Sequence, residues 1–212
     1  MVMRRGFSWG EGVERELPGE LKPGWLAANY AGADFFPLTF LPVRVVKAAM
    51  SIEQDLAKIA QQEQVLRFEQ FDERTAWEIG SRLKTAAEKR RAVLAIDITL
   101  LGQTVFSYMM PGTSPNNANW LRRKRNTVLH FRRSSYGFGL QLEHEKADLA
   151  GKYGLALSDY ATHGGSFPIW VSGAGVVGAI TVSGLPQRED HKIVTEVLAE
   201  FLQKTQPGLM LD

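Results

Sequence analysis

The segment 172–184, with the sequence SGAGVVGAITVSG, limits the fold more than any other part of the chain. Its glycines follow the Gly-x-Gly-x-x-Gly spacing of a dinucleotide-binding loop, which works only where a strand enters the loop and a helix leaves it. Residues 167–171 are typical of a strand, but the β-branched run 176–182 predicts a second strand instead of a helix. The segment therefore predicts a β-hairpin in which the first two glycines form the turn and Gly178 marks a close packing contact.

A second hairpin is predicted from the strand-like residues 92–101, a turn at Gly102-Gln103 and a returning strand over 104–110. Helices are predicted after the Ser51-x-x-Gln54 capping box, after Asp72, from Ser114-Pro115 to about Phe131, irregularly over 134–152, and after Pro186; a short strand is predicted over 64–68. Hairpins covered by helices indicate an α+β domain with an antiparallel sheet.

Residues 1–49 differ from the rest, because they contain ten Gly or Pro residues and no sustained period of 2 or 3.6. We therefore expect a domain over residues 50–212, with its packed part ending near Lys204. Residues 1–49 are expected to be an irregular or disordered extension, either a tail or a stretch upstream of the true start; a targeting role is the alternative.

Composition excludes several classes of function. Lys and Arg number 25 against 23 Asp and Glu, so no overall field attracts nucleic acid. Cysteine is absent, which removes disulfides, thiolate nucleophiles, cysteine-type zinc sites and iron–sulfur clusters. No apolar run has the length of a membrane span. We expect a cytoplasmic protein with no nucleic-acid partner and no membrane contact.

The segment 159–168 is the richest in groups that could bind a ligand. His163 precedes a predicted strand, and Gly164 and Gly165 would let a ligand approach backbone N–H groups. The imidazole could contact a ligand or a haem iron. The alternative is a histidine whose ring only hydrogen-bonds its own turn.

Four consecutive cations, residues 122–125, lie within the long predicted helix. Successive helical residues point about 100° apart, so these side chains cannot all serve one site. A solvated charged face is the usual explanation, but Arg125 and Asn126 could reach a carboxylate or a phosphate. Nucleic acid is a third interpretation, weakened by the nearly neutral total charge.

Metal binding is not expected. Glu143-His144-Glu145 places alternate residues about 200° apart on a helix, with no second histidine at ligand spacing. The acidic residues beside His191 fall in the first turn of the last predicted helix, where the helix dipole favours them.

Three blocks of sequence together resemble an uncharacterised family related to the haem-degrading HbpS-like and GlcG-like proteins: residues 124–128, 163–169 and 175–191. The resemblance covers about residues 50–205. It implies a profilin-like α-β-α layered domain with a central antiparallel sheet, assembled into rings or higher homo-oligomers, and for some relatives haem or corrinoid-linked chemistry. Phe167 stands where many relatives carry a smaller residue, so we expect its ring to occupy space beside the site.

If the relatives' pocket persists, the resemblance places the ligand-binding residues at Arg125, Asn126, His163, Gly164, Gly165, Ser183 and Gly184. Three classes of function stay open. The protein could be an oligomeric binding module for haem or another planar anionic molecule, an enzyme that modifies such a ligand, or a homo-oligomeric protein-interaction factor with a vestigial pocket.

Overall fold

The computed structural model of the protein describes residues 51–212, so the extension expected over residues 1–49 lies outside the described part of the chain. The elements follow in the order α1 (Ile52–Val65), α2 (Glu73–Lys89), β1 (Ala95–Leu100), β2 (Gln103–Met109), α3 (Pro115–Phe131), α4 (Ser135–His144), α5 (Leu149–Tyr153), β3 (Ser166–Val171), β4 (Gly175–Ser183) and α6 (Gln187–Phe201). The strands form an antiparallel sheet of order β2-β1-β4-β3, in which both predicted hairpins are neighbouring pairs. This confirms the α+β class.

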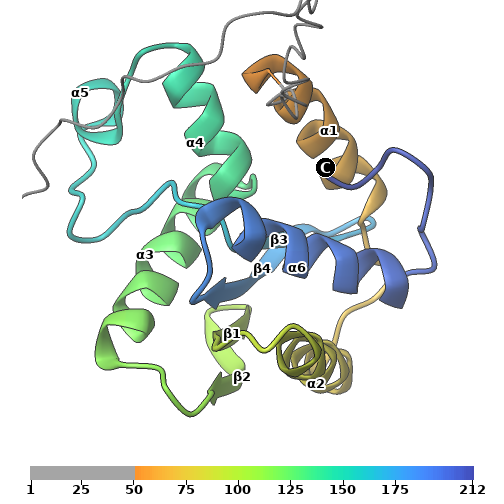
Figure 1. Ribbon diagram of the computed structural model, residues 1–212. Coiled ribbons are helices and arrows are strands. Elements are labelled where there is room, and N and C mark those ends of the chain that lie inside the picture. The colour runs from red at the N-terminus through yellow and green to blue at the C-terminus, as the bar shows by residue number, and fades with distance from the viewer. Residues whose placement is uncertain (1–50) are drawn as a thin grey trace, which may run out of the picture. The chain divides into compact units, whose positions relative to one another are not determined.

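Helices cover both faces of the sheet (Figure 1), with α2 and α6 on one face and α3 on the other. The alternation of side chains along a strand decides which face each residue meets. In β1, Ile96 and Ile98 belong to the main apolar core, whereas Asp97 and Thr99 bond to Arg125 of α3. The expected α-β-α layering is therefore present.

The layer between the sheet and the pair α2 and α6 is almost entirely apolar. Its fully buried side chains include Ile79, Leu83, Ile98, Ile180 and Ile193. Burying a side chain of this size stabilises a fold by about 1.5–3 kcal/mol, so this layer is the main source of the domain's stability.

The layer between the sheet and α3 is polar by contrast. Thr99 donates a hydrogen bond from Oγ1 to Asp97 Oδ1 at 3.0 Å, and Arg125 reaches the same oxygen at 2.8 Å. The buried hydroxyls of Ser166 and Thr181 are 2.8 Å apart on the same face of the sheet. Hydrogen bonds with defined geometry therefore set the position of α3 on the sheet.

The C-terminal segment packs beside α1, where the chain end is marked in Figure 1. Gln62 donates from Nε2 to the Leu209 carbonyl oxygen at 2.9 Å, and its Oε1 lies 2.9 Å from His191 Nε2. Leu211 joins a small core with Ile59. The packed part of the domain therefore continues beyond Lys204, and the expectation that it ends there was wrong.

His191 is buried at 1% exposure between α6 and α1. Burial, with a smaller contribution from the charge of Arg188, lowers the pKa of His191 from its usual 6.5 to about 3. Because the amide nitrogen of Gln62 is used by Leu209, its oxygen accepts the Nε2 proton of His191. The His191 Nδ1 atom has no hydrogen-bond partner in the described part of the chain.

The predicted helices and strands are present with one exception, although β1 is shorter than the predicted strand 92–101 and the region 134–152 contains two separate helices. Ser51 and Gln54 form the capping box of α1, and the turn glycines Gly173 and Gly175 have φ of 77° and 82°. Residues 64–68 are not a strand, because α1 continues to Val65. Only Phe68 pairs, in a single bridge to Val171.

Candidate functional site

The four cations at 122–125 do not form a solvated face. Three of them form ion pairs with carboxylates of the same chain: Arg122 with Asp159, Lys124 with Asp190, and Arg125 with Asp97. Among residues 51–212, Arg123 has neither an ion-pair partner nor a side-chain hydrogen bond, and its guanidinium lies over the ring of Trp120 at 4.5 Å. The run therefore contains one cation that the described chain leaves unpaired.

The ion pair of Lys124 and Asp190 is the most buried charged contact of the domain, with side-chain exposures of 3% and 2%. Lys124 Nζ lies 2.8 Å from Asp190 Oδ2 and also donates to the Val182 carbonyl oxygen at 2.9 Å. Asp190 Oδ1 accepts the Leu185 N–H at 2.9 Å. The pair thus joins α3, the end of β4 and the first turn of α6.

Burial shifts both groups of this pair toward their neutral forms. Desolvation lowers the pKa of Lys124, and its attraction to Asp190 opposes this shift. Desolvation likewise raises the pKa of Asp190, and Lys124 opposes it. Each group keeps its charge largely because the other is present.

A cleft of about 270 Å³ lies over this pair, between the start of α3 and the turn from β4 to α6. Its lining includes His163, Ser183 and Gly184, three of the predicted site residues, with Trp120, Asn117 and Gln187. Asn117 holds the two sides together, because its Nδ2 donates to the Ser183 carbonyl oxygen at 3.4 Å. The walls combine polar and apolar surface and include the rings of Trp120 and His163.

His163 stands at the edge of this cleft with its ring exposed. The ring packs edge-on against Trp120, with centroids 4.8 Å apart. Partial burial, and then the positive charges of Lys124 and Arg123, lower the pKa of His163 below its usual 6.5. Within residues 51–212 neither ring nitrogen has a hydrogen-bond partner, so a neutral imidazole at pH 7 offers a free nitrogen to a ligand.

Gly164 and Gly165 are required by packing against the protein's own backbone. Both are buried, and a Cβ atom on Gly164 would lie 1.9 Å from the Gln187 carbonyl oxygen. Gly165 has φ of 116°, and a Cβ atom there would approach the Val182 carbonyl oxygen to 2.6 Å. The two glycines position His163 by letting its loop pass close to α6 and β4; the wall of the cleft itself is formed by other residues.

Arg125 and Asn126 do not line this cleft. Arg125 points to Asp97 at 2.8 Å, and Asn126 donates from Nδ2 to the Asp159 carbonyl oxygen at 2.9 Å. Both follow Lys124 along the helix by one and two positions, so they are turned about 100° and 200° away from it. The structure therefore brings His163, Ser183 and Gly184 together and leaves these two residues elsewhere.

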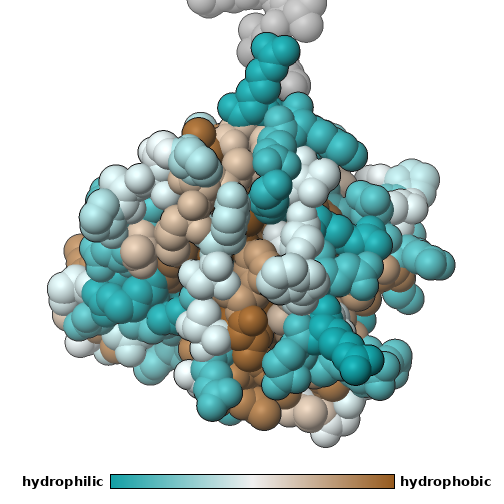
Figure 2. Space-filling model, turned by 90° about the horizontal axis from the view of Figure 1, so that it is seen from below, coloured by the Kyte–Doolittle hydropathy of each residue, from teal (hydrophilic) through white to brown (hydrophobic). Residues whose placement is uncertain are grey.

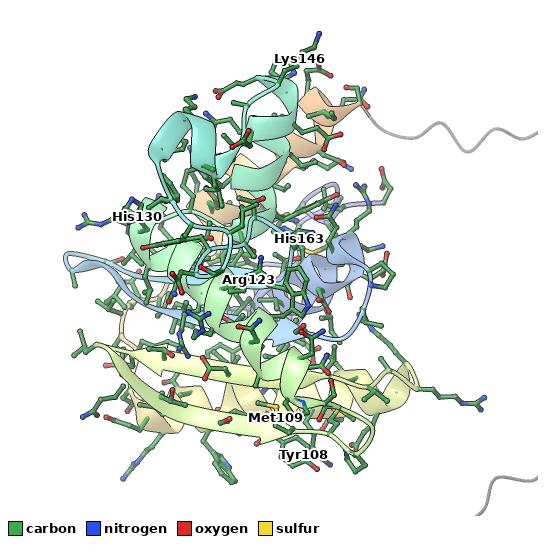
Figure 3. The ribbon with its side chains drawn as sticks, turned by 90° about the vertical axis from the view of Figure 1, so that its left-hand side faces the viewer. Tyr108, Met109, Arg123, His130, Lys146 and His163 are labelled. Atoms are coloured by element: carbon green, nitrogen blue, oxygen red, sulfur yellow. The ribbon has the colours of Figure 1, made fainter. Side chains whose placement is uncertain are left out.

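A second cleft, of about 280 Å³, lies on the other side of His163. Arg123 and His163 line one side of it, and residues of α4, α5 and the loop before β3 complete it. Figure 3 shows Arg123 on α3 and His163 on its loop beside one another, while His130 lies toward the far end of the same helix. With Trp120, which lines the first cleft, these two residues form the ridge between the clefts.

Two further expectations concern metal and haem. In the described part of the chain no three His, Cys, Asp or Glu side chains are grouped to hold a metal ion, and Glu143, His144 and Glu145 are exposed. Phe167 is 1% exposed in the apolar core, so its ring does not occupy the cleft and that expectation was wrong. No helix within residues 51–212 is long and apolar enough to cross a membrane.

Sequence reasoning missed Trp120, Arg123, Lys124 and Asp190. The spacing of Trp120, Lys124, Thr127 and Val128 on one side of the helix was a usable signal, because a lysine on an apolar helix face needs a buried acid as its partner. No sequence signal pointed to Asp190 as that acid.

Comparison with known proteins gives a consistent result. The family model described as "Haem degrading protein HbpS-like" matches residues 71–199. A UPF0303 protein of Serratia proteamaculans is 49% identical over 160 residues, which cover 76% of this chain and 99% of that protein. The crystal structure of the Ybr137w protein has a TM-score of 0.65 at 26% identity, covering 71% of this chain and 88% of that one. The structure of a PduOC:heme complex shares the fold, with a TM-score of 0.51 at 17% identity, covering 58% and 89% of the two chains.

Proposed function

Because this chain belongs to the haem degrading protein HbpS-like family, we propose that it binds a planar anionic small molecule, with haem as the first candidate, against the exposed ring of His163. The PduOC protein, which shares the fold, has been crystallised with heme. The binding surface is the ridge of Trp120, Arg123 and His163 between the two clefts.

The exposed imidazole of His163 is the observation that carries this proposal. A histidine is a common axial ligand of haem iron, and it must be neutral to donate its lone pair. The lowered pKa of His163 provides the neutral form, and the lack of a hydrogen-bond partner in the described chain leaves the nitrogen available. The other histidines are less suited: His191 is buried, His144 lies 3.3 Å from Glu53, and His130 is exposed but lines neither cleft.

The residue types around the ridge match the chemistry of a haem-like ligand, which is planar, aromatic and negatively charged. The Trp120 ring offers an aromatic surface, and the unpaired cation Arg123 favours a ligand with negative charge. Haem would supply an iron that accepts the imidazole nitrogen. The protein's own contribution is to hold His163 neutral and its loop fixed, through the close packing of Gly164 and Gly165.

Titration of the full chain with hemin at pH 7.5 tests the proposal. We expect a Soret band of imidazole-ligated iron that is lost in His163→Ala and kept in His130→Ala, which removes another exposed imidazole. The same spectrum and affinity in both variants would contradict the assignment of His163. Loss of the Soret band only when a reductant and oxygen are added would distinguish an enzyme from a binding module.

A second candidate function, a homo-oligomeric protein-interaction factor, is favoured by the surface around β2. The side chain of Trp77 is 68% exposed, and with Phe106 and Tyr108 it lines a cleft of about 340 Å³. Figure 2 shows this side of the molecule, where a hydrophobic strip runs between hydrophilic borders. β2 is an edge strand, and its sequence QTVFSYM carries no charge that would block pairing with another strand.

We propose that this surface joins subunits of a homo-oligomer, as the sequence resemblance implies, and that the protein works in the cytoplasm. Light scattering should give a mass above that of the 23.6 kDa chain, and Val105→Lys on β2 should reduce it. A monomeric mass at micromolar concentration would contradict the proposal. A protein partner retained after His163→Ala would favour the interaction factor over the ligand-binding module.

A further inference from the structure

Arg123 is a cation that residues 51–212 do not neutralise. Its three neighbours in the run each have a carboxylate partner, at 2.9 Å for Arg122, 2.8 Å for Lys124 and 2.8 Å for Arg125. Its own Nε is buried and has no hydrogen-bond partner, whereas its two terminal nitrogens are not among the buried unpaired atoms. A ligand from outside would therefore pair with the terminal nitrogens, and a charge-assisted hydrogen bond of this kind contributes about 1.5–3 kcal/mol.

The guanidinium of Arg123 is held in a defined place. It stacks over the Trp120 ring at 4.5 Å, and Trp120 in turn packs edge-on against His163. The Arg123 carbonyl oxygen also accepts the Ala161 N–H at 3.1 Å, which ties this turn of α3 to the loop that carries His163. These contacts hold the cation and the imidazole beside each other in the native state, so little side-chain entropy is lost when a ligand binds.

The acidic groups on the cleft do not satisfy Arg123. Asp148 caps α5 by accepting the Gly151 N–H at 2.7 Å, and Glu143 is exposed on α4. Neither forms an ion pair with Arg123. The other positive group on this ridge, Lys124, is occupied by Asp190. A single planar guanidinium suits a carboxylate, which it binds through two parallel hydrogen bonds, whereas a phosphate would draw on further cations that are already paired here.

We propose that Arg123 is a carboxylate-binding subsite, which takes the acid group of an aromatic or planar carboxylic acid whose flat part lies against Trp120 and His163. This inference deepens the proposed function and rests on it for the position of the flat part. It assigns the anion to Arg123 and not to Arg125, which Asp97 and Thr99 already occupy.

The test compares iron protoporphyrin IX with its dimethyl ester in one buffer and detergent. A charge-assisted hydrogen bond is worth about 1.5–3 kcal/mol, so the wild-type protein should prefer the acid by roughly 10- to 150-fold. Arg123→Gln should remove this preference, and Arg123→Lys should retain only part of it, because lysine lacks the planar fork. Arg122→Gln is the matched control, since Arg122 is the neighbour of Arg123 in the sequence and its charge is already paired with Asp159. An unchanged preference in Arg123→Gln, or none in the wild type, would overturn the inference.

A second probe separates this inference from the proposed function. Binding of 1-naphthoate and of 1-naphthamide, which lack iron, is followed by NMR of the Arg123 and Trp120 side-chain signals. We expect shifts with the acid only, lost in Arg123→Gln and kept in His163→Ala. If hemin does not bind through His163 but naphthoate binding still depends on Arg123, haem is rejected as the ligand and the carboxylate subsite is kept. The subsite would be rejected if naphthoate bound equally well to the wild type and Arg123→Gln. It would also be rejected if neither naphthoate nor iron protoporphyrin IX bound to the wild type. Far-UV circular dichroism confirms that each variant is folded.

Discussion

Breaking the buried pair of Lys124 and Asp190 from either side should give opposite dependences of stability on pH. Asp190→Asn keeps the acceptor for the Leu185 N–H and removes the negative charge, whereas Lys124→Met keeps the side-chain length and removes the positive one. The exposures of 3% and 2% leave the surviving charge with little water. An uncompensated buried charge of this kind costs about 3–5 kcal/mol, which is the expected loss in the free energy of unfolding for each variant near neutral pH.

The sign follows from the protonation of the group that remains. In Asp190→Asn the pKa of Lys124 falls further below its usual 10.5, so the folded state binds fewer protons than the unfolded state and stability rises with pH. In Lys124→Met the pKa of Asp190 rises further above its usual 3.8, so the folded state binds more protons and stability rises as pH falls. The slope in each case is limited to about 1.36 kcal/mol per pH unit.

Urea unfolding of the wild type and both variants at pH 5.5, 7.0 and 8.5 measures these differences. The double variant Lys124→Met/Asp190→Asn should lose less than the sum of the single losses, because it leaves no unpaired charge. Equal pH slopes in the two single variants, or single losses below about 1 kcal/mol, would refute the argument that desolvation governs this pair.

Four further outcomes are expected. His191→Gln should keep the hydrogen bond to Gln62 and reduce acid sensitivity, because the depressed pKa of about 3 makes the wild type lose roughly 2.3 kcal/mol of stability between pH 6.5 and 4.5. Equal losses in both proteins by urea unfolding would contradict this. Gly178→Ala should lower stability by about 3 kcal/mol, because its Cβ would lie 2.0 Å from the Thr99 carbonyl oxygen; an unchanged thermal midpoint would show that the strands separate freely. Deleting residues 1–49 should move the melting temperature by only a few degrees, and insoluble protein would show that these residues complete the core. Deleting residues 205–212 should lower it clearly in calorimetry, since Leu209 and Leu211 are buried; no change would contradict their place in the core.

The fold was largely predictable because local signals agreed with one another. The hairpin at 172–184 depends on glycines with positive φ and on β-branched runs, and both are visible in the sequence. The helix starts depend on caps such as Ser51, which act within one turn. The strand predicted over residues 64–68 is absent for a physical reason. α1 extends to Val65, and only Phe68 forms a bridge, so tertiary packing outweighed a weak local strand preference.

The site was less predictable because its members meet across the fold. Helical spacing shows that Arg123, Lys124 and Arg125 point in different directions, but only the structure shows which element each one faces. Asp97 is a single acid within the strand-like segment 92–101, and its partner Arg125 lies 28 positions further along the chain. The predicted anion-binding role therefore fell on Arg125, whose charge is already paired, two positions along the helix from the unpaired Arg123.

The polar layer under α3 has a consequence for how the domain moves. α3 contacts the sheet through hydroxyl groups and ion pairs, and its buried apolar residues are Leu121 and Val128. The layer on the opposite face of the sheet is a continuous apolar core. Detaching α3 therefore sacrifices much less hydrophobic free energy than separating α2 or α6 from the sheet. Native-state hydrogen exchange should show the amides of α3 opening together at a lower free energy than those of β1 and β4. Such an opening would carry Trp120 and Arg123 away from His163 and take the binding surface apart while the sheet stays intact.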